Sequence, residues 1–218
     1  MRTRTMRLEI GPARLPGDLV VPEPARGLVL FAHGSGSSRA SPRNRMVASV
    51  LQEAGLATFL FDLLTPAEAL DRAKVFDIDL LAGRLLEALD RLAEEPGPRG
   101  PPIGLFGAST GAAAALVAAA RSPEIRAVVS RGGRPDLAGA ALAGVRAPTL
   151  LIVGGEDHPV LELNRAAARR LGGPHRLVVV PGATHLFEEP GALERVAVLA
   201  RDFLVEQLSA TPPARGEG

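Results

Sequence analysis

Residues 103–112 read Ile-Gly-Leu-Phe-Gly-Ala-Ser-Thr-Gly-Ala, which predicts a short buried strand, a tight turn and the start of a helix. Within them, Gly107 to Gly111 match the pattern G-x-S-x-G, which is typical of a nucleophile elbow. The turn of an elbow is strained and projects one serine, here Ser109, from the end of the sheet. Glycines flank that serine because strand and helix approach too closely for a Cβ atom. The helix N-terminus that follows favours negative charge developing at Ser109.

A tight turn of small residues can produce the same five-residue pattern, so the flanking residues matter. Pro101–Pro102 stop the preceding segment, and the Ala-rich run 112–120 favours a helix. Particular residues exclude two phosphate-binding motifs. A Walker A loop requires a lysine after its glycines, and none follows Gly111. A dinucleotide fingerprint that began at Gly34 would need a glycine where Arg39 stands.

Length and composition fit one α/β domain with a sizeable core. We place this domain at residues 1–208 of the 218 and expect a disordered C-terminal tail at 209–218, which is rich in Pro and Gly. Hydrophobic residues make up 46% and charged residues 22%, an ordinary balance for a globular protein. We see no signal peptide and no apolar run long enough to span a bilayer, so we expect a cytoplasmic protein.

Charge and cysteine content exclude several classes of function. The net charge of +1 gives no reason to expect nucleic acid or an anionic membrane as a partner. We expect a small-molecule substrate and a monomer or homodimer. The absence of cysteine excludes a disulfide, a thiolate nucleophile and a thiolate metal site. Asp62, Asp77 and Asp79 lack a ligand cluster with histidine, so we expect neither a metal nor another cofactor.

Apolar runs alternate with helical patterns almost from end to end of the chain. Strands are expected at 7–10, 18–22, 27–32, 56–62, 103–106, 125–130, 148–154 and 176–180. Helices are expected at 42–54, 76–94, 112–120, 136–142, 160–171 and 192–208. This alternation predicts an α/β fold with a mostly parallel central sheet and helices on both faces. Ligands of such sheets bind beyond the carboxyl ends of the strands.

Three polar residues follow predicted strands in the chain order serine, acid, histidine: Ser109, Asp157 and His185. A serine hydroxyl becomes a good nucleophile when a base takes its proton, and a third group must orient that base. Asp157 would orient His185, and His185 would take the Ser109 proton and pass it to the leaving group. Glu156 is the alternative acid, and a helix cap is the alternative role for Asp157.

His185 is the best placed of the four histidines. His158 neighbours Asp157, on the wrong strand for the base, and His175 starts a strand and therefore lies at the opposite end of the sheet. His33 ends an early strand beside glycines, which fits an oxyanion loop or contact with substrate. The alternative for His185 is a loop residue that caps the last helix.

The oxyanion of a tetrahedral intermediate needs two hydrogen-bond donors. We expect the first from the backbone N–H of Thr110, the residue after the nucleophile. The second should come from the loop after Ala32, where Ser35 and Gly36 are the candidates. A merely flexible turn is the alternative for this loop.

Several side chains could contact the substrate. Arg131 follows a strand at the active end of the sheet and could bind a substrate carboxylate, or it could be a solvated or helix-capping arginine. Phe187 could line the pocket or could equally belong to the core. The run Arg39, Arg43 and Arg45 could bind an anion near the oxyanion loop, although an exposed helix start explains it better.

These motifs together resemble the α/β-hydrolase superfamily, and most of all its small dienelactone hydrolase-like serine hydrolases. The likeness covers about residues 27–208 and is carried by His33–Gly36, Gly107–Gly111, Gly154–Asp157 and Gly182–His185. It implies an α/β-hydrolase fold and serine-hydrolase chemistry. Dienelactone hydrolases proper use a cysteine nucleophile where Ser109 stands, so their lactone substrate is not implied. Residues 131–148 leave room for a small helix but not for the lid that the family often carries, which implies a shallow pocket.

We therefore expect a cofactor-free serine hydrolase that cleaves a small carboxylic ester, thioester or lactone through an acyl-enzyme on Ser109. A small peptidase or amidase on the same fold is one alternative. A non-catalytic hydrolase-fold protein that binds a ligand or partner is the other.

Overall fold

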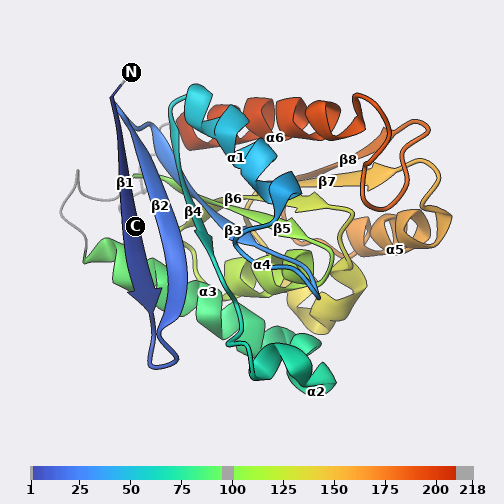
Figure 1. Ribbon diagram of the computed structural model, residues 1–218. Helices are drawn as coiled ribbons and strands as arrows, with labels where there is room; N and C mark the ends of the chain where they lie inside the picture. Colours follow the sequence, from blue (N-terminus) through green and yellow to red (C-terminus); the bar gives the residue numbers. More distant parts are fainter. Residues whose placement is uncertain (1, 95–100, 210–218) are drawn as a thin grey trace, which may run out of the picture.

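The computed structural model describes residues 2–94 and 101–209. An eight-stranded sheet in the order β1-β2-β4-β3-β5-β6-β7-β8 forms the middle layer (Figure 1). Its strands are β1 (Arg2–Ile10), β2 (Leu15–Glu23), β3 (Gly27–Ala32), β4 (Leu56–Phe61), β5 (Ile103–Ala108), β6 (Ile125–Arg131), β7 (Thr149–Gly154) and β8 (His175–Val180). The pairs β1–β2 and β2–β4 are antiparallel and all others are parallel, which confirms the predicted mostly parallel sheet.

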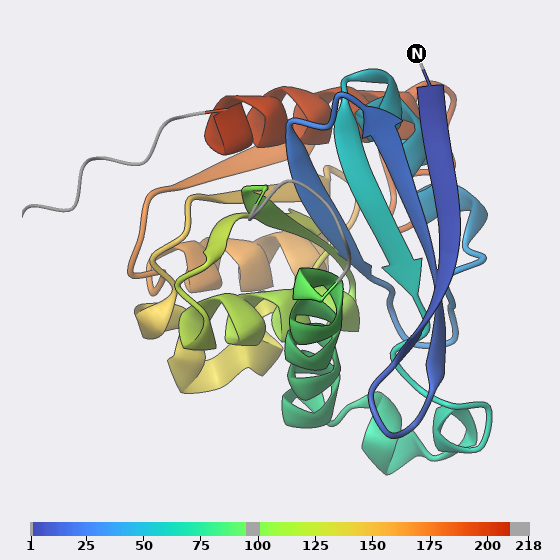
Figure 2. The same ribbon diagram turned by 90° about the vertical axis from the view of Figure 1, so that its left-hand side faces the viewer.

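Helices cover both faces of this sheet (Figures 1 and 2). They are α1 (Pro42–Glu53), η1 (Glu68–Leu70), α2 (Arg72–Val75), α3 (Ile78–Ala93), α4 (Thr110–Arg121), η2 (Pro135–Gly144), α5 (His158–Ala168) and α6 (Ala192–Ser209). Figure 1 shows α1 and α6 above the sheet and α3, α4 and α5 below it. Buried side chains of α1 and α6 form one large core cluster, and those of α3, α4 and η2 form a second, while Val160 and Leu161 of α5 pack with Val153 in a small third one.

The central strands are apolar throughout because both of their faces are covered. Every residue of β3, β4 and β7 is buried. Successive side chains alternate between the two cores, so Leu30 packs with the α3–α4 cluster and Phe31 with the α1–α6 cluster. A polar residue at the end of such a strand therefore projects toward one particular helical layer.

The N-terminal hairpin is longer than the sequence pattern predicted. Strands expected at 7–10 and 18–22 extend to Arg2–Ile10 and Leu15–Glu23, paired from Arg2 with Glu23 to Ile10 with Leu15. Residues 2–5 at the start of β1 are exposed and alternate Arg with Thr, so they carry no apolar signal. Backbone pairing at the sheet edge holds them in place.

The observed helix boundaries differ from the predicted ones where a capping residue is present. Helix α3 begins at Ile78 rather than 76 because the Asp77 side chain accepts a hydrogen bond from the Leu80 N–H. The last helix ends at Ser209, and the rest of the predicted tail lies outside the described residues. Within 2–94 and 101–209, no helix has the length and apolar character needed to cross a membrane.

Candidate active site

Ser109 occupies a strained backbone position between β5 and α4. Its φ of 51° and ψ of −121° lie in a region that non-glycine residues rarely adopt. The flanking glycines have no room for a side chain. A Cβ atom on Gly107 would lie 2.4 Å from the Ala112 Cα, and one on Gly111 would lie 2.2 Å from the Ala32 carbonyl oxygen. The crowding expected of a nucleophile elbow is therefore present at both glycines.

Asp157 and His185 meet beyond the carboxyl ends of β7 and β8. The His185 Nδ1 lies 2.6 Å from Asp157 Oδ2, a short charge-assisted hydrogen bond. The Asp157 side chain makes no capping hydrogen bond to α5, although the residue stands at its N-terminus. The alternative acid, Glu156, is exposed and lies 3.8 Å from the exposed His158. Asp157, and not Glu156, therefore contacts the imidazole of His185.

Ser109 and His185 line one small cavity of about 230 Å³. Residues of the loop after β3, of the first turn of α1 and of the end of β6 complete its wall. Within the described residues, no hydrogen bond joins the Ser109 hydroxyl to His185. Such contacts are often long in ligand-free enzymes and tighten when substrate binds.

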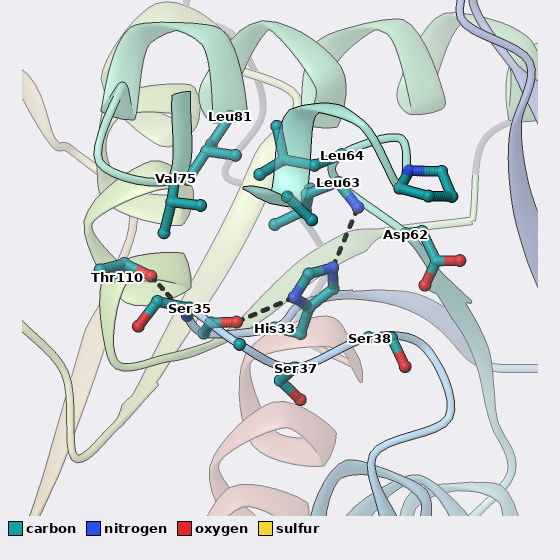
Figure 3. Close-up of a pocket in the computed structure, with 14 residues that line it drawn as sticks. His33, Ser35, Ser37, Ser38, Asp62, Leu63, Leu64, Val75, Leu81 and Thr110 are labelled. Carbon is teal, nitrogen blue, oxygen red and sulfur yellow. Dashed lines mark hydrogen bonds between the residues drawn. The ribbon is translucent and has the colours of Figure 1, made fainter. Parts of the chain in front are cut away.

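The loop after β3 lies directly against the nucleophile. A Cβ atom on Gly34 would lie 3.0 Å from the Ser109 Cβ, so a side chain at this position would crowd the nucleophile. The Ser35 N–H donates to the Thr110 hydroxyl over 3.0 Å (Figure 3), so it becomes available to an oxyanion only if that hydroxyl turns away. Gly36 is exposed, with a φ of +68°. Thr110 is the first residue of α4, so its N–H has no acceptor within the helix.

His33 holds this loop and lies away from the cavity of Ser109. It is only 8% exposed and lines a second cavity, of about 290 Å³, with Leu63 (Figure 3). Its Nε2 accepts from the Leu63 N–H, and its Nδ1 lies 3.0 Å from the Gly34 carbonyl oxygen, to which it donates. Both bonds together require the neutral ring, and burial lowers the pKa of His33 accordingly. The structure therefore favours the loop role over contact with substrate.

Arg131, at the end of β6, is buried and unpaired. It is 8% exposed, and its Nε and Nη1 have no hydrogen-bond partner. Burial, and secondarily the positive charge of Arg43, lowers the pKa of Arg131 to about 10, so the guanidinium stays charged at neutral pH. It also lines the cavity of Ser109. The solvated-arginine alternative is therefore wrong.

Phe187 is a core residue and does not line the cavity. It is 1% exposed and packs in the α1–α6 cluster, while its exposed neighbour Leu186 reaches the cavity wall. The backbone φ of Phe187 is 57°, which turns the chain at this point. Sequence reasoning missed Leu186 because an irregular loop has no periodicity that separates inward from outward residues.

The arginines near α1 divide into different roles. Arg39 pairs with Asp62 and also lies 3.5 Å from Asp18, so it ties the loop to the sheet. Arg45 is exposed and lies 3.9 Å from Asp18. Arg43 alone of the three lines the cavity of Ser109. Nowhere in the described part of the chain are three or more His, Asp or Glu side chains grouped so that they could hold a metal ion.

Comparison with known proteins decides the family. Residues 46–207 match the model of the dienelactone hydrolase family. The chain belongs to the dienelactone hydrolase family. A solved dienelactone hydrolase from Anabaena variabilis is 55% identical, and the match covers 94% of this chain and 98% of that one with a TM-score of 0.89.

Other relatives of this dienelactone hydrolase family member differ in length or in sequence. Proteins from two Mycobacterium tuberculosis strains, provisionally named phosphoribosyl transferases, are 59% identical over 215 residues. That match covers 98% of this chain but 48% of theirs, so the chain spans about half the length of these curated relatives. Est1E from Butyrivibrio proteoclasticus shares the fold at 18% identity, with a TM-score of 0.78 over 94% of this chain and 99% of that one. These comparisons place the chain among α/β-fold hydrolases.

Proposed function

We propose that the protein is a serine hydrolase that cleaves a small carboxylic ester, thioester or lactone through an acyl-enzyme on Ser109. One observation carries the proposal most directly. His185 is hydrogen-bonded to Asp157 over 2.6 Å and lines the same cavity as Ser109, whose backbone is strained. A base oriented by an acid and opening toward an elbow serine is the arrangement that activates a hydroxyl nucleophile.

The first half-reaction transfers the acyl group to the protein. Because the Nδ1–H of His185 donates to Asp157, its Nε2 is free to accept the Ser109 proton. The serine oxygen forms a bond to the substrate carbonyl carbon, whose oxygen becomes an oxyanion. The Thr110 N–H and a second donor from the loop Gly34–Gly36 stabilise this charge. The carbonyl carbon–leaving group bond then breaks, and the proton on His185 passes to the leaving alkoxide or thiolate.

The second half-reaction returns the protein to its starting state. A water molecule gives its proton to His185 and attacks the acyl carbon. The bond to the Ser109 oxygen breaks, and His185 returns the proton to that oxygen. The products are a carboxylic acid and the free alcohol or thiol, or one hydroxy acid when the substrate is a lactone. Each step uses side chains and backbone N–H groups of this chain together with water.

The name of the longer Mycobacterium tuberculosis relatives does not enter this proposal. The name phosphoribosyl transferase was given to the whole relative, and this chain spans about half of that relative's length. A peptidase or amidase remains an alternative within the fold, and a non-catalytic binding protein remains one outside enzymes. Turnover of p-nitrophenyl acetate beside that of p-nitroacetanilide separates ester from amide cleavage.

The test is intact mass after treatment with a fluorophosphonate, which reacts with activated serines. We expect one adduct on the native protein and none on Ser109→Ala. Ser37→Ala is the matched control, because Ser37 lines the same cavity but stands off the elbow, and its variant should label like the native protein. A folded native protein that takes no adduct would overturn the proposal and favour a binding protein.

A further inference from the structure

The cavity beside Ser109 has a cationic wall on its α1 side. Side chains alternate along β6, so Arg131 projects from the sheet on the same face as Val129, which packs in the α1–α6 cluster. This places its guanidinium next to the first turn of α1, where Arg43 lines the same cavity. Ser109 and His185 form the other part of the wall. Two arginines therefore line the cavity of Ser109 without being part of the Ser–His–Asp set.

Among the residues that the structure describes, none balances the charge of Arg131. Its Nε and Nη1 are buried and have no hydrogen-bond partner, and none of its atoms appears in an ion pair with a described carboxylate. Burying an unpaired charge costs several kcal/mol or shifts its pKa. A residue with that energetic penalty, facing a cavity, is a candidate for binding a ligand rather than for stabilising the fold.

Arg43 and the helix it belongs to add further positive charge. The Nε of Arg43 is also buried without a partner, and its Nη1 donates over 3.2 Å to the exposed Glu188. Helix α1 has 12 residues, and its first turn, with Ser41 as N-cap, lines the cavity. Pro42 has no N–H and the Asn44 N–H donates to the Ser41 hydroxyl, so the Arg43 N–H and the helix dipole are what this turn offers to an anion. Of the described residues that line this cavity, none is an Asp or Glu.

We propose that Arg131 and Arg43 form a subsite for a phosphate group carried by the substrate, so that the hydrolysed ester or lactone is a phosphorylated one. This inference rests on the proposed function for the reaction, but the subsite itself is a separate feature. Two guanidinium groups and a helix N-terminus provide donors from several directions, which suits a tetrahedral group with three terminal oxygens. A phosphate monoester carries about −1.5 to −2 charges at neutral pH, more than a single carboxylate. That charge matches two adjacent cations, of which Arg43 also contacts the exposed Glu188.

The first experiment measures binding without turnover. We expect 20 mM inorganic phosphate to raise the Tm of the native protein by roughly a few degrees relative to chloride at equal ionic strength. Succinate, the carboxylate probe, should raise the Tm much less. In Arg131→Met the phosphate effect should vanish, because losing a charge-assisted contact weakens binding about 10- to 100-fold. Arg45→Met is the matched control: Arg45 stands in the same turn region but lies outside the cavity, and its phosphate effect should persist.

The second experiment locates the bound phosphate at Ser109. Saturating phosphate should slow fluorophosphonate labelling of the native protein about 10-fold, and succinate should not. In Arg131→Met the ratio of labelling rates with and without phosphate should approach one. If the native protein takes no label at all, the proposed hydrolase function fails, whereas the Tm measurement still reports on the subsite.

Three outcomes would overturn the subsite. Phosphate could leave the native Tm unchanged, succinate could act as strongly as phosphate, or Arg45→Met could lose the effect as fully as Arg131→Met does. Folding is checked in the same scans. Because Arg131→Met removes an unpaired buried charge, its Tm without ligand should equal or exceed that of the native protein. A large drop in that Tm would indicate a structural role for Arg131 and would count against the proposal.

Discussion

At the scale of single residues, the site depends on one strained serine and one short hydrogen bond. The Ser109 backbone is held in its unusual conformation by hydrogen bonds on both sides, from its own N–H to the Arg131 carbonyl and from the Arg134 N–H to its carbonyl. The bond between His185 and Asp157 orients the imidazole. Strain of this kind persists only where the surrounding structure enforces it.

The role of Asp157 can be tested by removing its charge and keeping its shape. Asp157→Asn should lower kcat for a small activated ester by about 10³- to 10⁴-fold, because the amide favours the wrong tautomer of His185. The measurement is p-nitrophenyl acetate hydrolysis, with Tm as the check on folding. Glu156→Gln is the neighbouring control and should change kcat by less than about twofold. Equal losses in both variants would contradict the assignment of Asp157.

At the scale of elements, the close contact of α4 with β3 positions the nucleophile. Gly111 in the first turn of α4 lies against the last carbonyl groups of β3, and Gly83 in α3 has open space around the place of a side chain. Both glycines belong to helices, where glycine is intrinsically unfavourable relative to alanine. Substituting alanine at each of the two positions therefore separates the effect of side-chain crowding from the effect of helix propensity.

Alanine at these two glycines should have opposite effects. Gly111→Ala places a Cβ atom 2.2 Å from the Ala32 carbonyl oxygen, and we expect a loss of about 1–3 kcal/mol in the free energy of unfolding and slower labelling of Ser109. Gly83→Ala should raise the free energy of unfolding by about 0.5–1 kcal/mol. Urea unfolding of both variants is the measurement. Effects of the same sign would contradict the packing argument.

At the scale of the whole molecule, the parallel sheet gathers loops that are far apart in the chain. The loops after β3, β5, β6, β7 and β8 meet at one edge because parallel strands end on the same side. His33 ties the loop after β3, which contains Gly34, to the loop after β4, which contains Leu63. Because this tie requires the neutral ring, the protonation of one histidine affects the stability of the whole fold.

The stability should therefore fall below neutral pH through His33. Burial lowers the pKa of His33 below its ordinary value of 6.5 in the folded state, so the unfolded chain takes up this proton first on acidification. Its contribution is fully present above pH 6.5 and is lost as pH falls below that value, by at most about 1.4 kcal/mol per pH unit. The pKa values of Glu68 and Glu189 are lowered from 4.5, so these two groups contribute to the pH dependence of stability below that pH.

Urea unfolding at pH 7.5, 6.0 and 5.0 tests this dependence. The native protein should lose more stability over this range than His33→Gln, which has no ring to protonate. His33→Gln should be less stable than the native protein at pH 7.5, because the loop tie is weakened. Parallel pH profiles for the two proteins would contradict the assignment.

The amino-acid sequence by itself determined the α/β fold, the elbow at Ser109 and the chain order of Asp157 and His185, because these are local patterns of periodicity, turn residues and spacing. It left open whether Arg131 is solvated, whether Phe187 lines the pocket and which acid meets His185. Only the tertiary structure decided those points. The burial and pairing of a side chain depend on which helical layer it faces and on which groups surround it there. Those groups come from residues distant in the chain, so local patterns do not reveal them. Arg131 illustrates this point. Its side chain is charged whether it is exposed or buried, and only its place in the tertiary structure makes it an unpaired buried cation.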